Sequence, residues 1–311
     1  MKSTKTRLCR SYFTFAPEEI KKKTGNPDIL FMELNLSSFK KVQRFTDEFL
    51  SNEDRLDILI NNAGMLSSTP EVRAPKLTEN GIELTLMVNY FGPFLLTNNL
   101  LDTLKRSGPG SRVVTVSSLN HDFANPSAFK DLDNNLRVDG AANFALPDRP
   151  TVLPRSTDFV WHAFKSVFDK PGGIRYSNSK LAQVLFSQEL GKRLVGTGVT
   201  TYSLHPGAIL TDIGADRESG NYSLGFDIAA FMDVAAKLPD FVQPLTFAFK
   251  SLVEGAQTTI CCAVDEKLAL ETGLYYSDCE KARVNRSELN DEFAAAFWEW
   301  SERVIRQARA D

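Results

Sequence analysis

Short apolar runs alternate with longer segments of helical periodicity through most of this sequence. Each run has the length of one strand, and each helical segment is long enough to cross to the next strand. Strands joined by helices form a parallel sheet through right-handed crossovers, with helices on both faces. The predicted strands are residues 28–36, 56–60, 112–116 and 199–204, and the predicted helices are residues 39–50, 78–104 and 174–195.

Local sequence signals mark where these elements begin and end. Ser37 and Ser38 precede the first long helical segment, and serine is a favoured N-cap. Gly-Pro-Gly at residues 108–110 ends the next one. We see no internal repeat and no linker, so residues 1–311 are predicted to form a single α/β domain with a Rossmann-like, doubly wound parallel sheet.

Composition limits the classes of partner. The 311 residues are 42% hydrophobic and 24% charged, which is enough for a compact core. A net charge of −3 gives no basic field for nucleic acid. The basic N-terminus is either a solvated tail or a weak contact with an anionic membrane. Because no apolar run approaches the ~18 residues that span a bilayer, we expect a cytoplasmic protein with peripheral membrane contact at most.

The four cysteines show no CxxC spacing. Cys261 and Cys262 are adjacent, a poor arrangement for chelating a metal or for pairing with each other. We therefore expect Cys9, Cys261, Cys262 and Cys279 to be core thiols in a reducing compartment, and we predict no metal site.

Polar clusters follow the predicted strands, at the edge of the sheet where open α/β folds bind ligands. These clusters are residues 61–64, 117–118 and 205–207. Tyr176 and Lys180 share one face of a predicted helix. A nearby cation favours the phenolate, so the pair predicts a tuned proton donor and acceptor. Taken alone, a Tyr-xxx-Lys match also arises by chance.

Taken in order, these motifs resemble the short-chain dehydrogenase/reductase family. The similarity is greatest to its retinol-dehydrogenase-like branch, which includes the oxidoreductase domain of the WW-domain-containing oxidoreductase, and it extends from about residue 18 to residue 307. The resemblance rests on residues 23–27, 56–64, 88–92, 112–118, 176–182, 200–207, 254–259 and 276–279.

The resemblance implies a catalytic tetrad of Asn89, Ser118, Tyr176 and Lys180. Tyr176 would exchange a proton with the substrate oxygen, and Ser118 would hydrogen-bond that oxygen. Lys180 would hold the nicotinamide ribose and lower the pKa of Tyr176. Asn89 would anchor a proton-relay water. In isolation, Ser118 is equally well a strand-end cap and Asn89 a buried helix polar group.

The resemblance also implies a nicotinamide cofactor, NADP in the first place and NAD as the alternative. Asn35 stands where the family has an acidic residue that contacts adenine, and Arg10 stands where an arginine favours the NADP phosphate. The implied cofactor-binding residues are Asn35, Asn62, Ala63, Gly64, Tyr176, Lys180, Pro206, Gly207 and Thr211.

One family feature has no counterpart in the sequence. The family begins with a strand and a Thr-Gly-xxx-Gly-x-Gly turn whose backbone amides hold the cofactor pyrophosphate. Here Gly25 is the sole glycine among the first 27 residues. We therefore expect an N-terminally incomplete domain that lacks the first strand-helix unit, and with it a central strand of the sheet.

The sequence thus predicts an NADP(H)-type oxidoreductase that interconverts a lipophilic, retinol-like alcohol and its aldehyde or ketone. Residues 119–172, rich in aromatic side chains, are predicted to be an extended insertion on the substrate side, with residues 138–158 alternatively a disordered stretch. The competing hypothesis is a truncated, catalytically impaired reductase-like protein that acts as a binding module. A homo-oligomer remains open.

Overall fold

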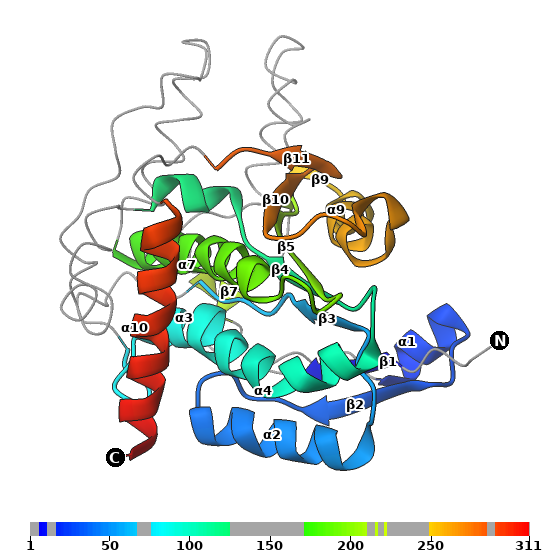
Figure 1. The fold of residues 1–311 in the computed structure, drawn as a ribbon, viewed down its shortest axis with the longest axis horizontal. Coiled ribbons are helices and arrows are strands. Elements are labelled where there is room, and N and C mark those ends of the chain that lie inside the picture. Colours follow the sequence, from blue (N-terminus) through cyan, green and yellow to red (C-terminus); the bar gives the residue numbers. More distant parts are fainter. Residues whose placement is uncertain are drawn as a thin grey trace, which may run out of the picture.

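The computed structural model describes residues 6–10, 17–66, 76–124, 171–209, 215–216, 221–222, 249–284 and 290–310. Its main sheet has the strand order β11-β10-β5-β4-β3, with β11 antiparallel to β10 and all other pairs parallel (Figure 1). The predicted parallel sheet is confirmed. Its strands are β3 (Ile58–Asn61), β4 (Arg112–Val116), β5 (Thr200–His205), β10 (Leu274–Ser277) and β11 (Glu280–Ala282).

A second, separate parallel sheet contains β1 (Thr6–Arg10) and β2 (Ile29–Glu33), which are joined through α1 (Pro17–Thr24). Among the described strands, β3 pairs with β4 alone. Ile58 and Ile60 of β3 are 36% and 44% exposed, although the predicted sheet would bury them. Among the described strands the sheet is thus divided, because neither β1 nor β2 pairs with β3.

Two further pairs of short strands lie outside these sheets. β6 (Ala208–Ile209) pairs in parallel with β9 (Phe249–Lys250), and β7 (Ala215–Asp216) pairs in antiparallel fashion with β8 (Asn221–Tyr222).

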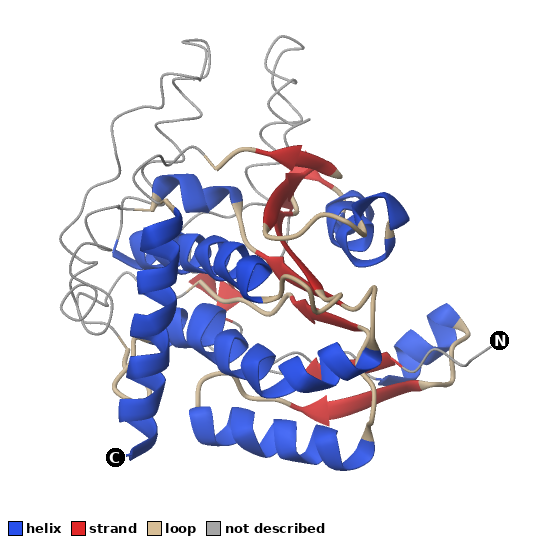
Figure 2. Cartoon of the chain, in the orientation of Figure 1, coloured by secondary structure: helices blue, strands red, loops and turns tan. Residues whose placement is uncertain are grey.

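Helices cover both faces of the main sheet (Figure 2). β4 shows why, because all five of its residues are buried: Val113 joins the larger core cluster, and Val114 and Val116 join the cluster on the opposite face. The larger cluster is built on α2 (Phe39–Asn52), α4 (Gly92–Ser107), α7 (Pro171–Arg193) and α10 (Asp291–Ala310), and the smaller one on α9 (Leu252–Val264) and η8 (Glu266–Leu268).

The first long helix begins where the sequence predicts. The Ser38 side chain accepts a hydrogen bond from the Lys41 backbone amide, which makes it the N-cap of α2. The helix then buries Phe39, Val42, Phe45 and Phe49 on one face. Capping and periodicity therefore agree at this position, and both predictions are confirmed.

The predicted helix at residues 78–104 is wrong at its start. Residues 78–82 form a turn in which the Thr78 amide donates to the Ile82 carbonyl and Gly81 takes a φ of +68°. Helical structure begins only at α3 (Leu84–Leu86), passes through the π-helix η1 (Met87–Phe91) and continues as α4. The apolar spacing runs on through Gly81, so it gave no sign of the positive φ at this residue, which a helix does not accommodate without cost.

The prediction of core thiols is wrong for two cysteines. Cys261 of α9 and Cys279, in the turn between β10 and β11, form a disulfide (sequence separation 18), whereas Cys262 is a free, buried thiol. Adjacent helix residues point about 100° apart, so Cys262 packs inward while Cys261 reaches the turn. The pairing depends on how β10 returns beside α9, which cysteine spacing does not reveal.

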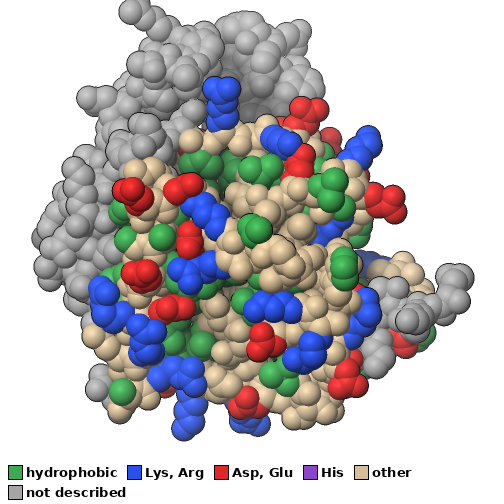
Figure 3. Space-filling model, viewed as in Figure 1, with side chains coloured by type: hydrophobic (Ala, Val, Ile, Leu, Met, Phe, Trp, Pro, Cys, Tyr) green, Lys and Arg blue, Asp and Glu red, His purple; other side chains and the backbone are tan. Residues whose placement is uncertain are grey.

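Basic and acidic side chains intermix on the face of the molecule in Figure 3 and do not gather into patches of one sign. Within the described ranges, no helix combines the length and the apolar character that crossing a membrane would need.

We predict that reduction of the Cys261–Cys279 disulfide lowers the free energy of unfolding by about 3 kcal/mol, because the bond closes a loop of 18 residues. Urea denaturation with and without reductant measures the change. A Cys279→Ser variant should start at the lower stability and should not respond to reductant. Equal stability of the parent protein under both conditions would contradict the prediction.

Candidate active site

Helix α7 carries the centre of the candidate site. Tyr176, Lys180 and Gln183 lie on one face of this helix and are all buried. Polar groups in such a position need hydrogen-bond partners, because an unpaired buried donor or acceptor is costly. The site is therefore best described by the partners that each side chain finds.

Ser118 and Tyr176 meet as the sequence predicts. Ser118 follows β4 and is the N-cap of the short helix η2 (Leu119–Phe123), where its side chain accepts from the Asn120 amide. It also hydrogen-bonds the Tyr176 side chain, and this contact favours the phenolate. Burial has the larger effect and raises the pKa of Tyr176 to about 12, so the phenol keeps its proton at neutral pH.

The Lys180 amine lies deep between α7 and the sheet. Its Nζ donates to the Val116 carbonyl at 3.1 Å and to Gln183 Oε1 at 3.1 Å. Burial lowers the pKa of Lys180 to about 7. The amine is 5.4 Å from the centre of the Tyr176 ring. The expected lowering of the Tyr176 pKa by Lys180 is not seen in this structure, because burial dominates at both groups.

Asn89 joins the segment after β3 to α7. It lies within η1, and π-helical segments of this kind are frequent at functional sites. Its side chain accepts from the Met65 amide at 2.8 Å and donates to the Met65 carbonyl at 2.9 Å and to Ser179 Oγ at 2.9 Å. A Cβ at Gly64 would lie 3.3 Å from Lys180 Nζ, so a glycine suits this close approach.

The remaining predicted cofactor residues lie at the carboxyl ends of the strands or outside the described ranges. Asn62 is exposed after β3, Ala63 is half-buried, and Pro206 and Gly207 are half-buried after β5. Asn35 follows β2, where its Oδ1 accepts from the Ser37 backbone amide and hydroxyl, so the side chain is turned into its own loop. Thr211 and residues 125–170 of the predicted insertion lie outside the described residues.

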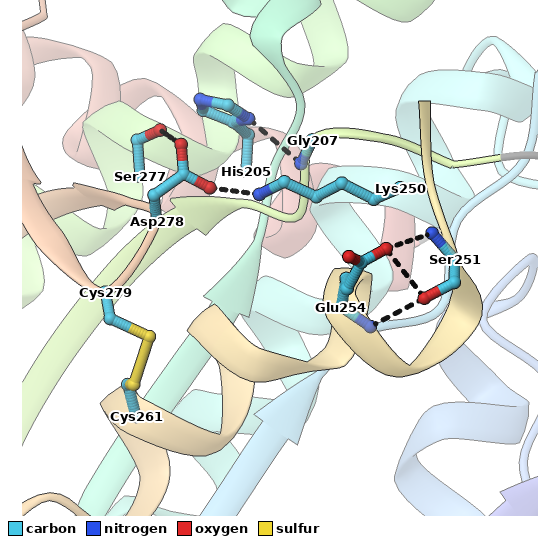
Figure 4. A network of polar contacts seen from close by, with 9 residues as sticks. All are labelled: His205, Gly207, Lys250, Ser251, Glu254, Cys261, Ser277, Asp278 and Cys279. Carbon is cyan, nitrogen blue, oxygen red and sulfur yellow. Dashed lines mark hydrogen bonds and ion pairs between the residues drawn. A yellow bond between two sulfur atoms is a disulfide. The ribbon is translucent and has the colours of Figure 1, made fainter. Parts of the chain in front are cut away.

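A polar network supports the segment after β5 (Figure 4). The Gly207 amide donates to His205 Nδ1 at 3.1 Å, and Gly207 takes a φ of +88°. The Lys250 side chain passes so close that a Cβ at Gly207 would lie 2.7 Å from its Cδ, and its amine binds Asp278. Neither Lys250 nor Asp278 was assigned a role from the sequence: Lys250 lies in β9, outside every motif of the resemblance, and Asp278 lies in the turn after β10.

The same network is tied to α9. Ser251 and Glu254 form a reciprocal capping box at the start of this helix, directly after Lys250. The Cys261–Cys279 disulfide attaches the helix to the turn that holds Asp278 (Figure 4). The disulfide therefore joins α9 to the turn whose Asp278 binds Lys250, the side chain packed against Gly207.

The geometry of the site fits the nicotinamide end of a nicotinamide cofactor. A protonated amine has three N–H groups, and the hydrogen bonds of Lys180 to Val116 and Gln183 leave one for a ribose hydroxyl. Gly64 allows the backbone after β3 to approach the Lys180 amine closely. The described residues contain no glycine-rich turn for a pyrophosphate.

Comparison with known proteins identifies the family of the chain. A model of the short chain dehydrogenase family matches residues 11–129. Retinol dehydrogenase 11 of Homo sapiens is 34% identical over 284 residues, which cover 91% of this chain and 71% of the relative. Retinol dehydrogenase 12 of Mus musculus is 35% identical over 283 residues, covering 91% and 72%. The chain therefore belongs to the short-chain dehydrogenase family of oxidoreductases.

A solved structure shows the same fold at lower identity. The Pseudomonas aeruginosa RhlG/NADP active-site complex superposes with a TM-score of 0.55 at 18% identity, over 86% of this chain and 82% of that chain. The Rossmann-like fold expected from the resemblance is confirmed.

We predict that Lys180 makes stability depend on pH. Its folded pKa of about 7 lies below the ordinary 10.5, so only the unfolded state holds the proton between these values. The free energy of unfolding should therefore rise with pH in this window, by at most about 1.4 kcal/mol per pH unit. Urea denaturation from pH 6 to 10, with Lys180→Met as reference, isolates this effect.

At and below pH 7 the Lys180→Met variant should be the more stable protein, because it avoids burying a charge, and the difference should shrink toward pH 10. A constant difference between the two proteins across this range would contradict the prediction.

Proposed function

We propose that the protein is a nicotinamide-dependent oxidoreductase that interconverts a lipophilic, retinol-like alcohol and its aldehyde or ketone. The observation that carries this proposal is the buried Tyr176, which hydrogen-bonds the half-buried Ser118 and has the Lys180 amine 5.4 Å from its ring centre. The names of the retinol dehydrogenase relatives support the substrate class.

Tyr176 is the proton donor and acceptor in this proposal. At neutral pH its raised pKa keeps the phenol protonated, which is the form that gives a proton to a carbonyl oxygen during reduction. Ser118 hydrogen-bonds the same oxygen, where negative charge develops. In the reverse direction, Tyr176 accepts the alcohol proton as the phenolate, after its own proton has left to solvent.

The cofactor supplies or accepts the hydride when it is bound. Lys180 and Tyr176 would hold its ribose, with the segments after β3 and β5 on either side. NADP is the proposed form, with NAD as the alternative. The NADP complex of the structural neighbour and the position of Arg10 at the carboxyl end of β1 support this choice. The proposed contacts are Asn35, Asn62, Ala63, Gly64, Tyr176, Lys180, Pro206, Gly207 and Thr211.

We predict that Tyr176→Phe lowers kcat/KM for retinaldehyde reduction by about 10²–10⁴-fold, the usual effect of losing a general acid. The measurement is NADPH oxidation with retinaldehyde, compared with a short polar aldehyde. Tyr202→Phe is the matched control, since the hydroxyl of this β5 residue donates to the Leu268 carbonyl at 2.6 Å and lies 2.9 Å from Thr200 Oγ1. Near-parental turnover by Tyr176→Phe would remove this residue from the mechanism, and a preference for the polar aldehyde would reject the substrate class.

We predict weak cofactor binding by the 311-residue chain. Each backbone hydrogen bond to a charged group contributes about 1.5–3 kcal/mol. A glycine-rich turn would make two or three, so their loss costs about 3–9 kcal/mol, or on the order of 10²–10⁶ in affinity. NADPH fluorescence should show this deficit, and a fused strand with a glycine-rich turn ahead of Thr6 should restore both binding and stability.

Tight NADPH binding by the unfused chain would contradict this prediction. A fused chain that gains stability and still binds no NADPH would favour the alternative, a reductase-like binding module.

A further inference from the structure

Gln183 connects two parts of the site through a single buried amide. Its Oε1 accepts from Lys180 Nζ at 3.1 Å, and its Nε2 donates to the Asn89 carbonyl at 2.7 Å. The side chain is 1% exposed. A backbone carbonyl can only accept and an ammonium can only donate, so the amide satisfies both partners in just one orientation.

The helix places Gln183 where this connection is possible. It follows Lys180 by three residues and Tyr176 by seven, so the three side chains line one face of α7. Asn89 approaches this face from η1, and its side chain is already bonded to Met65 and Ser179. Gln183 therefore reaches Asn89 through the backbone carbonyl, and the resemblance assigns to Asn89 a proton-relay water.

We propose that Gln183 is a positioning residue that holds the Lys180 amine in place by anchoring it to the Asn89 carbonyl. This inference rests on the proposed function, in which Lys180 supports Tyr176 and the cofactor ribose. An amide donates and accepts hydrogen bonds without releasing a proton near neutral pH. Gln183 thus fixes Lys180 in space and does not pass a proton between Lys180 and Asn89.

The surroundings of Lys180 make its titration a direct report on this contact. Tyr176, on the same helix, is the titratable side chain that faces the amine. Strand β4 presents the Val116 carbonyl, η1 presents Asn89, and the segment after β3 presents Gly64. A change of charge or of acceptor at position 183 should therefore alter the proton affinity of Lys180 strongly.

The test compares Gln183→Glu with Gln183→Met in the unfolding experiment described for Lys180. The glutamate keeps an oxygen acceptor and adds a negative charge, so the midpoint of the Lys180 titration should move up by one pH unit or more. The methionine has a similar size and removes both hydrogen bonds, so the midpoint should move down. Gln188→Met is the matched control on the same helix, since its half-buried side chain donates to Asp291 Oδ1 at 2.9 Å.

Unchanged midpoints, or an equal loss of stability at every pH, would overturn the inference and leave Gln183 with a packing role. If either variant fails to fold, NMR of the parent protein replaces it: the Gln183 side-chain amide protons should shift with the same midpoint as Lys180, and a pH-independent signal would overturn the inference.

Enzyme assays separate this inference from the proposed function. In an active protein, Gln183→Met should shift the pH profile of kcat/KM, whereas Gln188→Met should not, and an unshifted profile would count against the inference. If the parent protein reduces no carbonyl substrate, the proposed function fails, and the titration still decides the role of Gln183.

Discussion

The buried amine of Lys180 is the constraint around which the rest of the site is arranged. An amine removed from water is tolerated only when oxygen atoms surround it. Here β4 supplies the Val116 carbonyl, and Ser117 from the end of the same strand donates its hydroxyl to the Lys180 carbonyl at 2.8 Å. The contacts that seat α7 on the sheet are therefore the contacts that hold the site together. Stability and chemistry in this region cannot be altered independently.

Local patterns were sufficient to predict the elements that carry the site. β4 matches its predicted range of 112–116, because a strand covered on both faces appears in sequence as a continuous apolar run. The start of α2 follows from Ser38, whose cap needs only neighbouring residues. The i, i+4 spacing placed Tyr176 and Lys180 on one helix face. In each case the signal and the structure lie within a few residues of each other.

Features that depend on distant parts of the chain were not predictable in this way. The turn before α3 depends on a left-handed Gly81 and on pairing of Leu77 with Glu83, and neither alters the apolar spacing. In the sequence, Gln183 could not be told apart from other polar helix residues, because its partner is the Asn89 carbonyl, 94 positions earlier. The pKa values of Tyr176 and Lys180 likewise reflect their depth, which spacing does not encode.

The exposure of β3 bears on the tendency of the folded protein to aggregate. Among the described strands β3 has β4 as its one neighbour, and an unpaired strand edge beside the partly exposed Ile58 and Ile60 is a template on which another extended chain can add a strand. Just before this edge, Arg55 and Asp57 form an exposed ion pair, and charges near a strand edge are a common means of discouraging such addition. These two surface charges therefore act against strand addition at the place where Ile58 and Ile60 are partly exposed.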